Sequence, residues 1–364
     1  MPGLSFAVAS AEPPPGPHRL HQMHAPHFPR SGEELRSALA GLLDGLPPRQ
    51  AAQAVERLIA SYRGLTPTDA PVLRDRSDVA AYAAYRMPAT FEAVRSALEA
   101  FRDRLPAFVP ASHVDVGGGT GAATWAVASA WEGESRETTV LDWAAPALAL
   151  GSELAGTASD PALRAARWER GIIGDGLRVL DGTDLVTVSY VLKELTDAGR
   201  AAVVAEAARA AQAVVIVEPG TPDGYLRIIE ARDRLIAAGL RVVAPCPHSG
   251  ACPIEPGKDW CHFSARVSRS SLHRQVKGGS LAYEDEKFAY VAAVRGDLPS
   301  ASASVPARIV RKPQIRKGQV LLELCTAEDG LTRETVTKRH GDAYKVARDA
   351  DWGDEWSAPD RGVS

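Results

Sequence analysis

The sequence contains only four cysteines, Cys246, Cys252, Cys261 and Cys325. The first three fall within sixteen residues, in the string PCPHSGACPIEPGKDWCHF, and the fourth follows far downstream. A secreted disulfide scaffold would be shorter and denser in cysteine. Thiolates clustered in this way favour a metal centre, and all four cysteines are candidate ligands.

The spacing of the thiols leaves two kinds of centre open. Four thiolates suit either a tetrahedral zinc ion or an iron–sulfur cluster. Zinc sites usually contain two pairs of ligands separated by two to four residues, and no such pair is present. The close C-x₂-C-x₂-C run of ferredoxins is absent too. The wide gaps lean toward a [4Fe–4S] cluster, with zinc as the alternative, and the neighbours His248 and His262 favour supporting roles.

A second candidate site is the glycine-rich string HVDVGGGTGAATWA. Glycines let a backbone turn sharply and let a ligand approach it closely. A nicotinamide loop would read G-x-G-x-x-G, whereas here the spacing is G-x-G-x-G with an acid two residues before it. This resembles the first motif of class I S-adenosylmethionine-dependent methyltransferases. The predicted cofactor-binding residues are Asp115, Gly117, Gly118, Gly119, Gly121 and, for the ribose hydroxyls, Asp142 at the end of the next strand.

No catalytic residue can be identified. The fourth predicted strand ends in SYVLKEL. Many amino-methylating enzymes of this fold carry an Asn/Asp-Pro-Pro-aromatic turn there, and this sequence has none. It also lacks the Pro-Cys pair used for methylation of cytosine C5. Ser189, Tyr190, Lys193 and Glu194 could contact a substrate, but structural roles are the simpler interpretation.

A basic segment follows the cysteines. Residues 262–320 hold eleven Lys and Arg against four acids, in a chain whose net charge is −3. Such a patch can neutralise phosphates and release counterions, although a solvated face is the plain alternative. The candidate RNA-binding residues are Arg266, Arg269, Arg274, Lys277, Arg308, Arg311, Lys312, Arg316 and Lys317.

The alternation of strands and helices predicts an α/β fold with a mostly parallel, Rossmann-like sheet of the class I methyltransferase type. Strands are expected at 113–116, 138–142, 184–191, 213–218 and 240–244, with a late edge strand at 288–294. Helices are expected at 31–44, 48–62 and from 77 to 105, the last broken at Met87-Pro88.

We expect four parts along the chain: a disordered tail (1–30), a helical N-terminal section (31–110), a Rossmann-like domain (111–298) with a metal loop (245–280), and a small β-rich segment (299–364) that supplies Cys325. No apolar run is long enough to span a membrane. A cytoplasmic monomer is expected.

Together the motifs HVDVGGGTG, CPHSGACPIEPGKDWCHFSARVSRSSLHRQVKGG, EDEKFAYV and LELCTAEDG resemble a methyltransferase-like family of small-ribosomal-subunit assembly factors, which has mitochondrial members and bacterial homologues. The resemblance covers roughly residues 75–356. It implies an S-adenosylmethionine-binding fold, a [4Fe–4S] cluster held by the four cysteines, and binding to small-subunit ribosomal RNA during assembly.

The sequence is therefore compatible with three functions. The leading hypothesis is an assembly factor whose cluster and basic segment dock on RNA. The alternative is an active S-adenosylmethionine-dependent rRNA methyltransferase. A redox or radical enzyme is disfavoured, because radical enzymes of this cofactor leave one iron open, and here a fourth cysteine is available.

Overall fold

The computed structural model describes residues 30–42, 53, 55–56, 76–270, 281–296, 298 and 307–357. The predicted tail before Arg30 and most of the helix expected at 48–62 lie outside these residues, as do Arg274 and Lys277. No helix in the described part of the chain is long and apolar enough to cross a bilayer.

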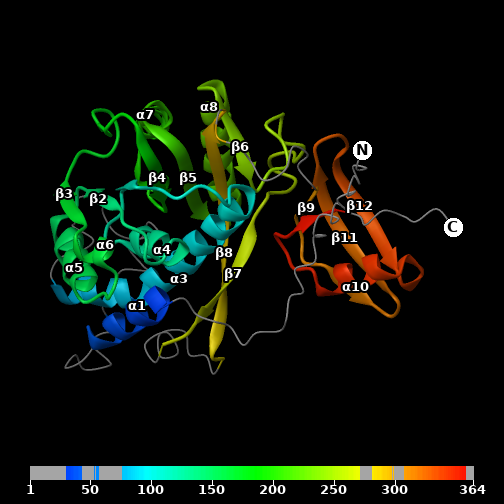
Figure 1. Ribbon diagram of the computed structural model, residues 1–364, viewed down its shortest axis with the longest axis horizontal. Helices are drawn as coiled ribbons and strands as arrows, with labels where there is room; N and C mark the ends of the chain where they lie inside the picture. The colour runs from blue at the N-terminus through cyan, green and yellow to red at the C-terminus, as the bar shows by residue number, and fades with distance from the viewer. Residues whose placement is uncertain are drawn as a thin grey trace, which may run out of the picture.

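An eight-stranded mixed sheet forms the centre of the larger unit (Figure 1). Its order is β3-β2-β1-β4-β5-β8-β6, and β7 pairs with β8 outside this path. The strands are β1 (Ser112–Val116), β2 (Glu137–Asp142), β3 (Arg167–Arg170), β4 (Thr183–Ser189), β5 (Ala211–Pro219), β6 (Leu240–Ala244), β7 (Phe263–Ser268) and β8 (Tyr283–Arg295). The class I methyltransferase-like fold predicted from the sequence is confirmed.

The position of β8 corrects one prediction. The strand expected at 288–294 is not at an edge, because it runs antiparallel between β5 and β6. Residues Phe288 to Val294 are all buried. A strand covered on both faces belongs in the interior of a sheet, whatever its order along the chain.

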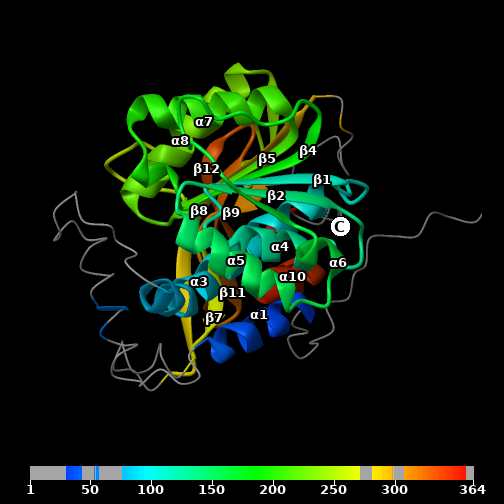
Figure 2. The ribbon, with the colours of Figure 1, turned by 90° about the vertical axis from the view of Figure 1, so that its left-hand side faces the viewer.

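Helices cover both faces of the sheet (Figure 2). One face is covered by five helices: α1 (Arg30–Gly41), α3 (Arg76–Arg104), α4 (Ala122–Ala130), α5 (Ala145–Gly156) and α6 (Pro161–Arg164). The opposite face is covered by α7 (Asp197–Ala210) and α8 (Pro222–Ala237). Consecutive residues of strand β4 therefore point to opposite faces of the sheet. Leu185 joins the core beneath α3 and α4, and Val186 joins the core beneath α7 and α8, as the period of two requires.

Helix α3 also departs from the prediction, because it continues through Met87-Pro88 without a break. Proline removes one backbone hydrogen bond and disfavours helix at the residue before it. Here Met87, Ala89 and Phe91 are all buried in the core against the sheet. We attribute the continuity to this packing, which offsets the local cost of the proline.

The C-terminal unit is a five-stranded β half-barrel with its own core. It contains β9 (Ala307–Ile309), β10 (Gln314–Arg316), β11 (Gln319–Thr326), β12 (Gly330–Thr337) and β13 (Glu355–Trp356), with the short helices η3 (Lys338–His340) and α10 (Asp342–Asp349). Val320, Leu322 and Leu324 alternate along β11 and face this core. The small β-rich C-terminal segment expected from the sequence is thus present.

A buried charge cluster joins the two units. Arg104, at the end of α3, lies 3.6 Å from Glu355 of β13, and Arg308 of β9 lies 3.1 Å from the same carboxylate. Arg308 also donates to the carbonyl oxygens of Pro245 (2.9 Å) and Gly353 (2.7 Å). Both guanidinium groups are nearly inaccessible to water, so Glu355 supplies the charge that compensates them.

We predict that Glu355→Ala lowers the free energy of unfolding by about 2–3 kcal/mol, because it leaves two buried cations without their counter-ion. Glu323→Ala is the matched control. Glu323 pairs at 3.6 Å with an exposed Arg333, and such pairs contribute about 1 kcal/mol or less. Urea unfolding of both variants tests the difference, and equal losses would contradict the role given to Glu355.

Candidate functional site

The glycine loop joins the end of β1 to the start of α4. Gly117, Gly119 and Gly121 have φ values of 67°, 54° and 85°, a region that side chains with a Cβ rarely adopt. Space is limiting as well, because a Cβ on Gly117 would lie 2.6 Å from Val191 and one on Gly121 would lie 2.5 Å from Trp168. The alternate glycines are therefore required by the backbone itself.

Asp142 stands at the end of β2 and fixes this loop from the side. Its Oδ2 accepts a hydrogen bond from Gly119 N at 2.9 Å, and its Oδ1 accepts one from Ala144 N at 2.8 Å. Burial raises the pKa of Asp142 above its ordinary value, while these backbone donors oppose the shift. The predicted ribose-binding carboxylate is thus adjacent to the predicted loop.

Asp115 lies beneath the loop and not in the open space above it. It is completely buried, and its two carboxylate oxygens accept hydrogen bonds from the hydroxyls of Thr187 (2.9 Å) and Thr124 (3.0 Å). Burial raises the pKa of Asp115 to about 6, and the two threonines partly oppose the rise. The geometry gives Asp115 the role of supporting the loop from inside.

A groove of about 690 Å³ opens at Trp143, the residue that follows Asp142. Neither Asp142 nor a residue of the glycine loop is among the residues that line it. This volume is in the range of small-molecule sites. Its lining includes Trp143, Ile172 and Glu194, and the Trp143 side chain is 59% exposed. A large aromatic surface left open beside a carboxylate can cover a flat, polar ligand. Trp143 and Ile172 were not singled out in the sequence, because an apolar residue after a strand gives no signal of exposure.

The end of β4 carries a backbone outlier. Tyr190 is the only non-glycine residue with positive φ (58°) in the described part of the chain. Its hydroxyl donates to Glu286 at 3.1 Å, and the Arg86 guanidinium lies 5.5 Å from the centre of its ring. Arg86 in turn pairs with Glu286 at 3.2 Å. The Tyr190 ring is thus held between α3 and β8 by these two side chains.

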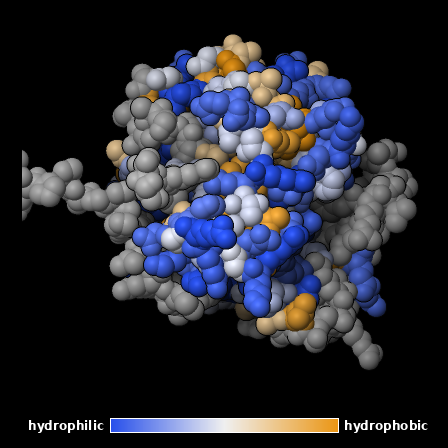
Figure 3. Space-filling view, turned by 90° about the vertical axis from the view of Figure 1, so that its right-hand side faces the viewer, coloured by the Kyte–Doolittle hydropathy of each residue, from blue (hydrophilic) through white to orange (hydrophobic). Residues whose placement is uncertain are grey.

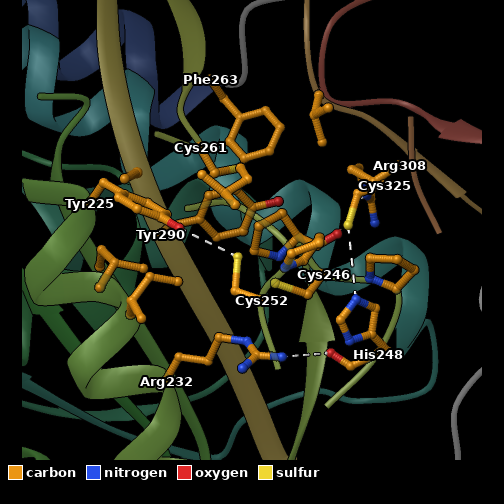
Figure 4. A pocket seen from close by; sticks show the side chains of 18 residues that line it. Tyr225, Arg232, Cys246, His248, Cys252, Cys261, Phe263, Tyr290, Arg308 and Cys325 are labelled. Atoms are coloured by element: carbon orange, nitrogen blue, oxygen red, sulfur yellow. Dashed lines mark hydrogen bonds between the residues drawn. The ribbon is translucent and has the colours of Figure 1, made fainter. Parts of the chain in front are cut away.

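A cavity between the larger unit and the half-barrel collects the four cysteines (Figure 4). Its volume is about 30 Å³. Cys246 follows β6, Cys252 lies in the irregular loop after it, Cys261 precedes β7, and Cys325 comes from β11. The structure therefore brings together thiols that are far apart in sequence, and no pair forms a disulfide.

Burial and the neighbouring cysteines raise the pKa of three of these thiols. The pKa of Cys246 and that of Cys261 are raised, first by burial and then by neighbouring cysteines, and the pKa of Cys325 is raised to about 12 for the same reasons. Arg232 and Arg308 oppose the shifts at Cys246 and Cys325. A positive centre would release the protons and bind the thiolates.

Arg232 of α8 supports the loop on one side of the cavity. Its side chain is 1% exposed, and its Nη2 donates to the carbonyl oxygens of His248 (3.0 Å) and Gly250 (2.5 Å). Its Nε is buried without a hydrogen-bond partner in the described structure. A buried cation with one unsatisfied N–H, beside four thiols, fits an anionic sulfur group in the cavity.

The cysteines are not arranged as a site for one ion. Among the residues that the structure describes, no three His, Cys, Asp or Glu side chains are placed to hold a single metal ion. His248 and His262 each contact a neighbouring side chain. His248 Nε2 lies 3.9 Å from Cys325 Sγ, and the His262 ring stacks on Trp260 at 5.2 Å. The supporting roles expected for the two histidines stay a prediction.

The predicted RNA-binding residues are distributed over two regions. On the β7–β8 ribbon, Arg266 pairs with Asp285 (3.5 Å) and Arg269 with Glu284 (3.2 Å). Arg311 pairs with Asp259. Arg308 is 4% exposed, so an RNA contact is not supported for it, because its donors are used between the two units. Lys312, Arg316 and Lys317 are exposed on the half-barrel.

A further basic pair, missed in the sequence, lies beside Arg316 and Lys317. In the sheet register, Arg316 is opposite Gln319, and Gln319 is opposite Thr337. Lys338 and Arg339, which follow Thr337, are therefore at the same end of the sheet, and both are exposed. We call Arg316, Lys317, Lys338 and Arg339 the basic end. Figure 3 views the molecule from the half-barrel side, where most described atoms are hydrophilic.

Comparison with known proteins gives matches at the level of family. The profile of the family described as "Mitochondrial small ribosomal subunit Rsm22" matches residues 76–357. The human protein named "Ribosome assembly protein METTL17, mitochondrial" is 31% identical over 288 residues, which cover 75% of this chain and 61% of that protein. The Saccharomyces cerevisiae "Ribosome assembly protein RSM22, mitochondrial" is 23% identical over 33% of this chain and 29% of its own. The chain thus spans less than two thirds of these relatives.

Solved structures with similarity to this chain include methyltransferases. A putative RNA methyltransferase from Pyrococcus horikoshii is 14% identical with a TM-score of 0.37, over 56% of this chain and 84% of its own. An S-adenosylmethionine-dependent methyltransferase from Aquifex aeolicus is 16% identical with a TM-score of 0.37, over 60% and 98%. The fold assignment rests on the strand order and not on these scores.

We predict that Asp115→Asn removes a pH dependence of stability. The folded state keeps a proton on Asp115 up to about pH 6, whereas an unfolded chain releases it near 3.8. Wild-type stability therefore falls as pH rises between these values, by about 3 kcal/mol for a shift of about two units. Urea unfolding from pH 4 to 7 measures this, and parallel curves for the two proteins would contradict the buried carboxylate's role.

Proposed function

The chain belongs to the family described as mitochondrial small ribosomal subunit Rsm22, and from that premise we propose that it is an assembly factor that binds RNA of the small ribosomal subunit. The observation that carries this proposal is the family match over residues 76–357, which includes the glycine loop, all four cysteines and the basic end. The names of the two relatives as ribosome assembly proteins support it.

We propose S-adenosylmethionine as the ligand of the groove. The glycine loop of residues 117–121 would approach the ligand closely, Asp142 would accept the ribose hydroxyls, and Trp143 would cover the adenine. Asp142 already holds the loop through Gly119. Support comes from the groove's position at the carboxyl ends of parallel strands, where open α/β sheets bind ligands.

We propose a [4Fe–4S] cluster held by Cys246, Cys252, Cys261 and Cys325, in preference to zinc. The donor set fits, since four thiols line one cavity beside two buried guanidinium groups. The cysteine spacing lacks the two close ligand pairs that are usual for zinc, which supports the larger group. Because the cavity is small and the cysteine loop irregular, binding would order the loop as it forms.

The RNA contact is proposed at the basic end together with Lys312. Within the described residues, no acidic partner is seen for Arg316, Lys317, Lys338 or Arg339, whereas the arginines of the β7–β8 ribbon are paired with acids. Unpaired cations can neutralise phosphates without first losing an ion pair. Arg266 and Arg269 form a weaker candidate contact.

Methyl transfer to RNA is a second candidate, and one observation favours it. Glu194 lines the groove, and burial together with the charges of Asp142 and Glu218 raises its pKa to about 7. A carboxylate with that pKa suits a general base at neutral pH. Transfer of a labelled methyl group to ribosomal RNA would distinguish this activity from assembly alone.

The compartment stays a prediction. The relatives are named as mitochondrial proteins, while a cytoplasmic monomer was expected from this sequence. The proposal of binding to the small subunit applies in either compartment.

For the RNA contact, we predict that Arg316→Glu combined with Lys317→Glu weakens binding to small-subunit ribosomal RNA at least tenfold. The slope of log K against log salt should fall by about 1.4, since each phosphate contact with a single strand contributes about 0.7. Lys345→Glu with Arg348→Glu is the control, because both residues already pair with acids on α10. An unchanged slope in the first variant would refute the basic end as a contact.

For the metal centre, anaerobic purification with iron, sulfide and zinc analysis is the direct test. We expect about four irons and four sulfides per chain, the content of a cubane, and their loss in Cys252→Ser. A wild-type protein with one zinc and no sulfide would replace the cluster with a structural zinc. Because RNA binding is measured separately, that result would leave the assembly-factor proposal standing.

A further inference from the structure

Two tyrosine hydroxyls line the cysteine cavity, and only one of them contacts a sulfur. Tyr225 Oη lies 3.4 Å from Cys252 Sγ, marked by a dashed line in Figure 4. Tyr290, on β8, lines the same cavity, but the described structure gives no hydrogen bond from its hydroxyl to a thiol. The two residues are otherwise alike, since both are at most 5% exposed.

The position of Tyr225 is rigid. It lies in the first turn of α8, whose N-cap Thr221 accepts a hydrogen bond from Gly224 N at 3.1 Å. The start of the helix is pressed against the end of β5, because a Cβ on Gly224 would lie 1.9 Å from the Pro219 carbonyl oxygen. A ring fixed in this way presents its hydroxyl at one place, where it contacts Cys252.

A buried hydroxyl needs a partner, and a sulfur that carries negative charge is a better acceptor than a neutral thiol. Two other polar side chains lie near thiols: His248, at the longer distance of 3.9 Å from Cys325, and the Arg232 guanidinium, which hydrogen-bonds to Cys246. Hydrogen bonds to ligating sulfurs are one of the means by which proteins set the potential of iron–sulfur clusters.

We propose that Tyr225 is a positioning residue for the metal centre, which donates a hydrogen bond to the ligating sulfur of Cys252 and raises the reduction potential of the cluster. The inference rests on the proposed [4Fe–4S] centre. Reduction adds one electron and makes the sulfurs more negative, so a donor stabilises the reduced form more than the oxidised form. Removing the hydroxyl favours the oxidised form.

The test is Tyr225→Phe in the full chain, with Tyr290→Phe as the matched control. Both variants lose one hydroxyl from the same cavity. We expect both to retain the wild-type iron and sulfide content, while the one-electron reduction equilibrium of Tyr225→Phe shifts about tenfold toward the oxidised cluster, or about 59 mV lower. Tyr290→Phe should keep the wild-type potential. Anaerobic redox titration followed by electron paramagnetic resonance measures all three proteins.

The outcomes separate this inference from the proposal beneath it. A cluster-bearing Tyr225→Phe with the wild-type potential overturns the role of Tyr225 alone. Equal shifts in both variants also overturn it, because they would report a general change in cavity polarity. A wild-type protein without iron and sulfide overturns the cluster and this inference together. A tenfold shift confined to Tyr225→Phe establishes the hydrogen bond as the cause.

Discussion

The pairing of β8 between β5 and β6 is the constraint on which the arrangement of the four cysteines depends. The cysteine loop leaves the sheet at the end of β6 and returns at the start of β7, and both of these strands pair with β8. Because β8 is buried from Phe288 to Val294, it cannot slide without exposing apolar side chains. The ends of an otherwise irregular loop are thereby fixed, and three cysteines in that loop acquire defined places.

One carboxylate connects this region with the groove at Trp143. Glu218, at the end of β5, is fully buried, accepts a hydrogen bond from Leu192 N at 3.1 Å, and pairs with Arg227 at 2.7 Å. Leu192 begins the short helix η2 (Leu192–Glu194) at the edge of the groove, while Arg227 lies on α8 with Tyr225. Both candidate sites are therefore built on the same end of one central strand. Because Glu218 contacts both η2 and α8, it holds the two candidate sites at a fixed position relative to each other.

The sequence predicted what depends on local patterns. Alternate glycines after a strand predicted a tight loop, and three of them have positive φ. The alternation of strands and helices predicted strands at 213–218 and 288–294. The pairing partner of a strand is a property of the whole sheet, so β8 was wrongly predicted at an edge. Helix α3 was predicted to break at Pro88 because the local rule ignores the core that holds it.

The candidate functional residues that the sequence did not reveal depend on distant contacts. Tyr225 and Arg232 belong to an ordinary amphipathic helix until the fold places them beside the thiols. Lys338 and Arg339 join Arg316 and Lys317 only through the register of three strands. Arg308 shows the reverse case, since a basic residue in a basic segment is buried by its position between the two units.

The distance between the basic end and the cysteines indicates that the proposed cluster would act on the basic end by holding the half-barrel in place, not by direct contact. Arg316 is opposite Gln319, and Cys325 lies six residues further along β11, a separation of about 20 Å at about 3.4 Å per residue. Cys325 and the basic end therefore lie at opposite ends of β11 and do not form one continuous surface. Cys325 is the only thiol contributed by the half-barrel, so a group bound by all four cysteines would fasten that strand to the larger unit. Such a bound group would also fix the position of the basic end relative to the groove. An RNA that contacts both would then bind two preorganised sites and not two sites that move independently.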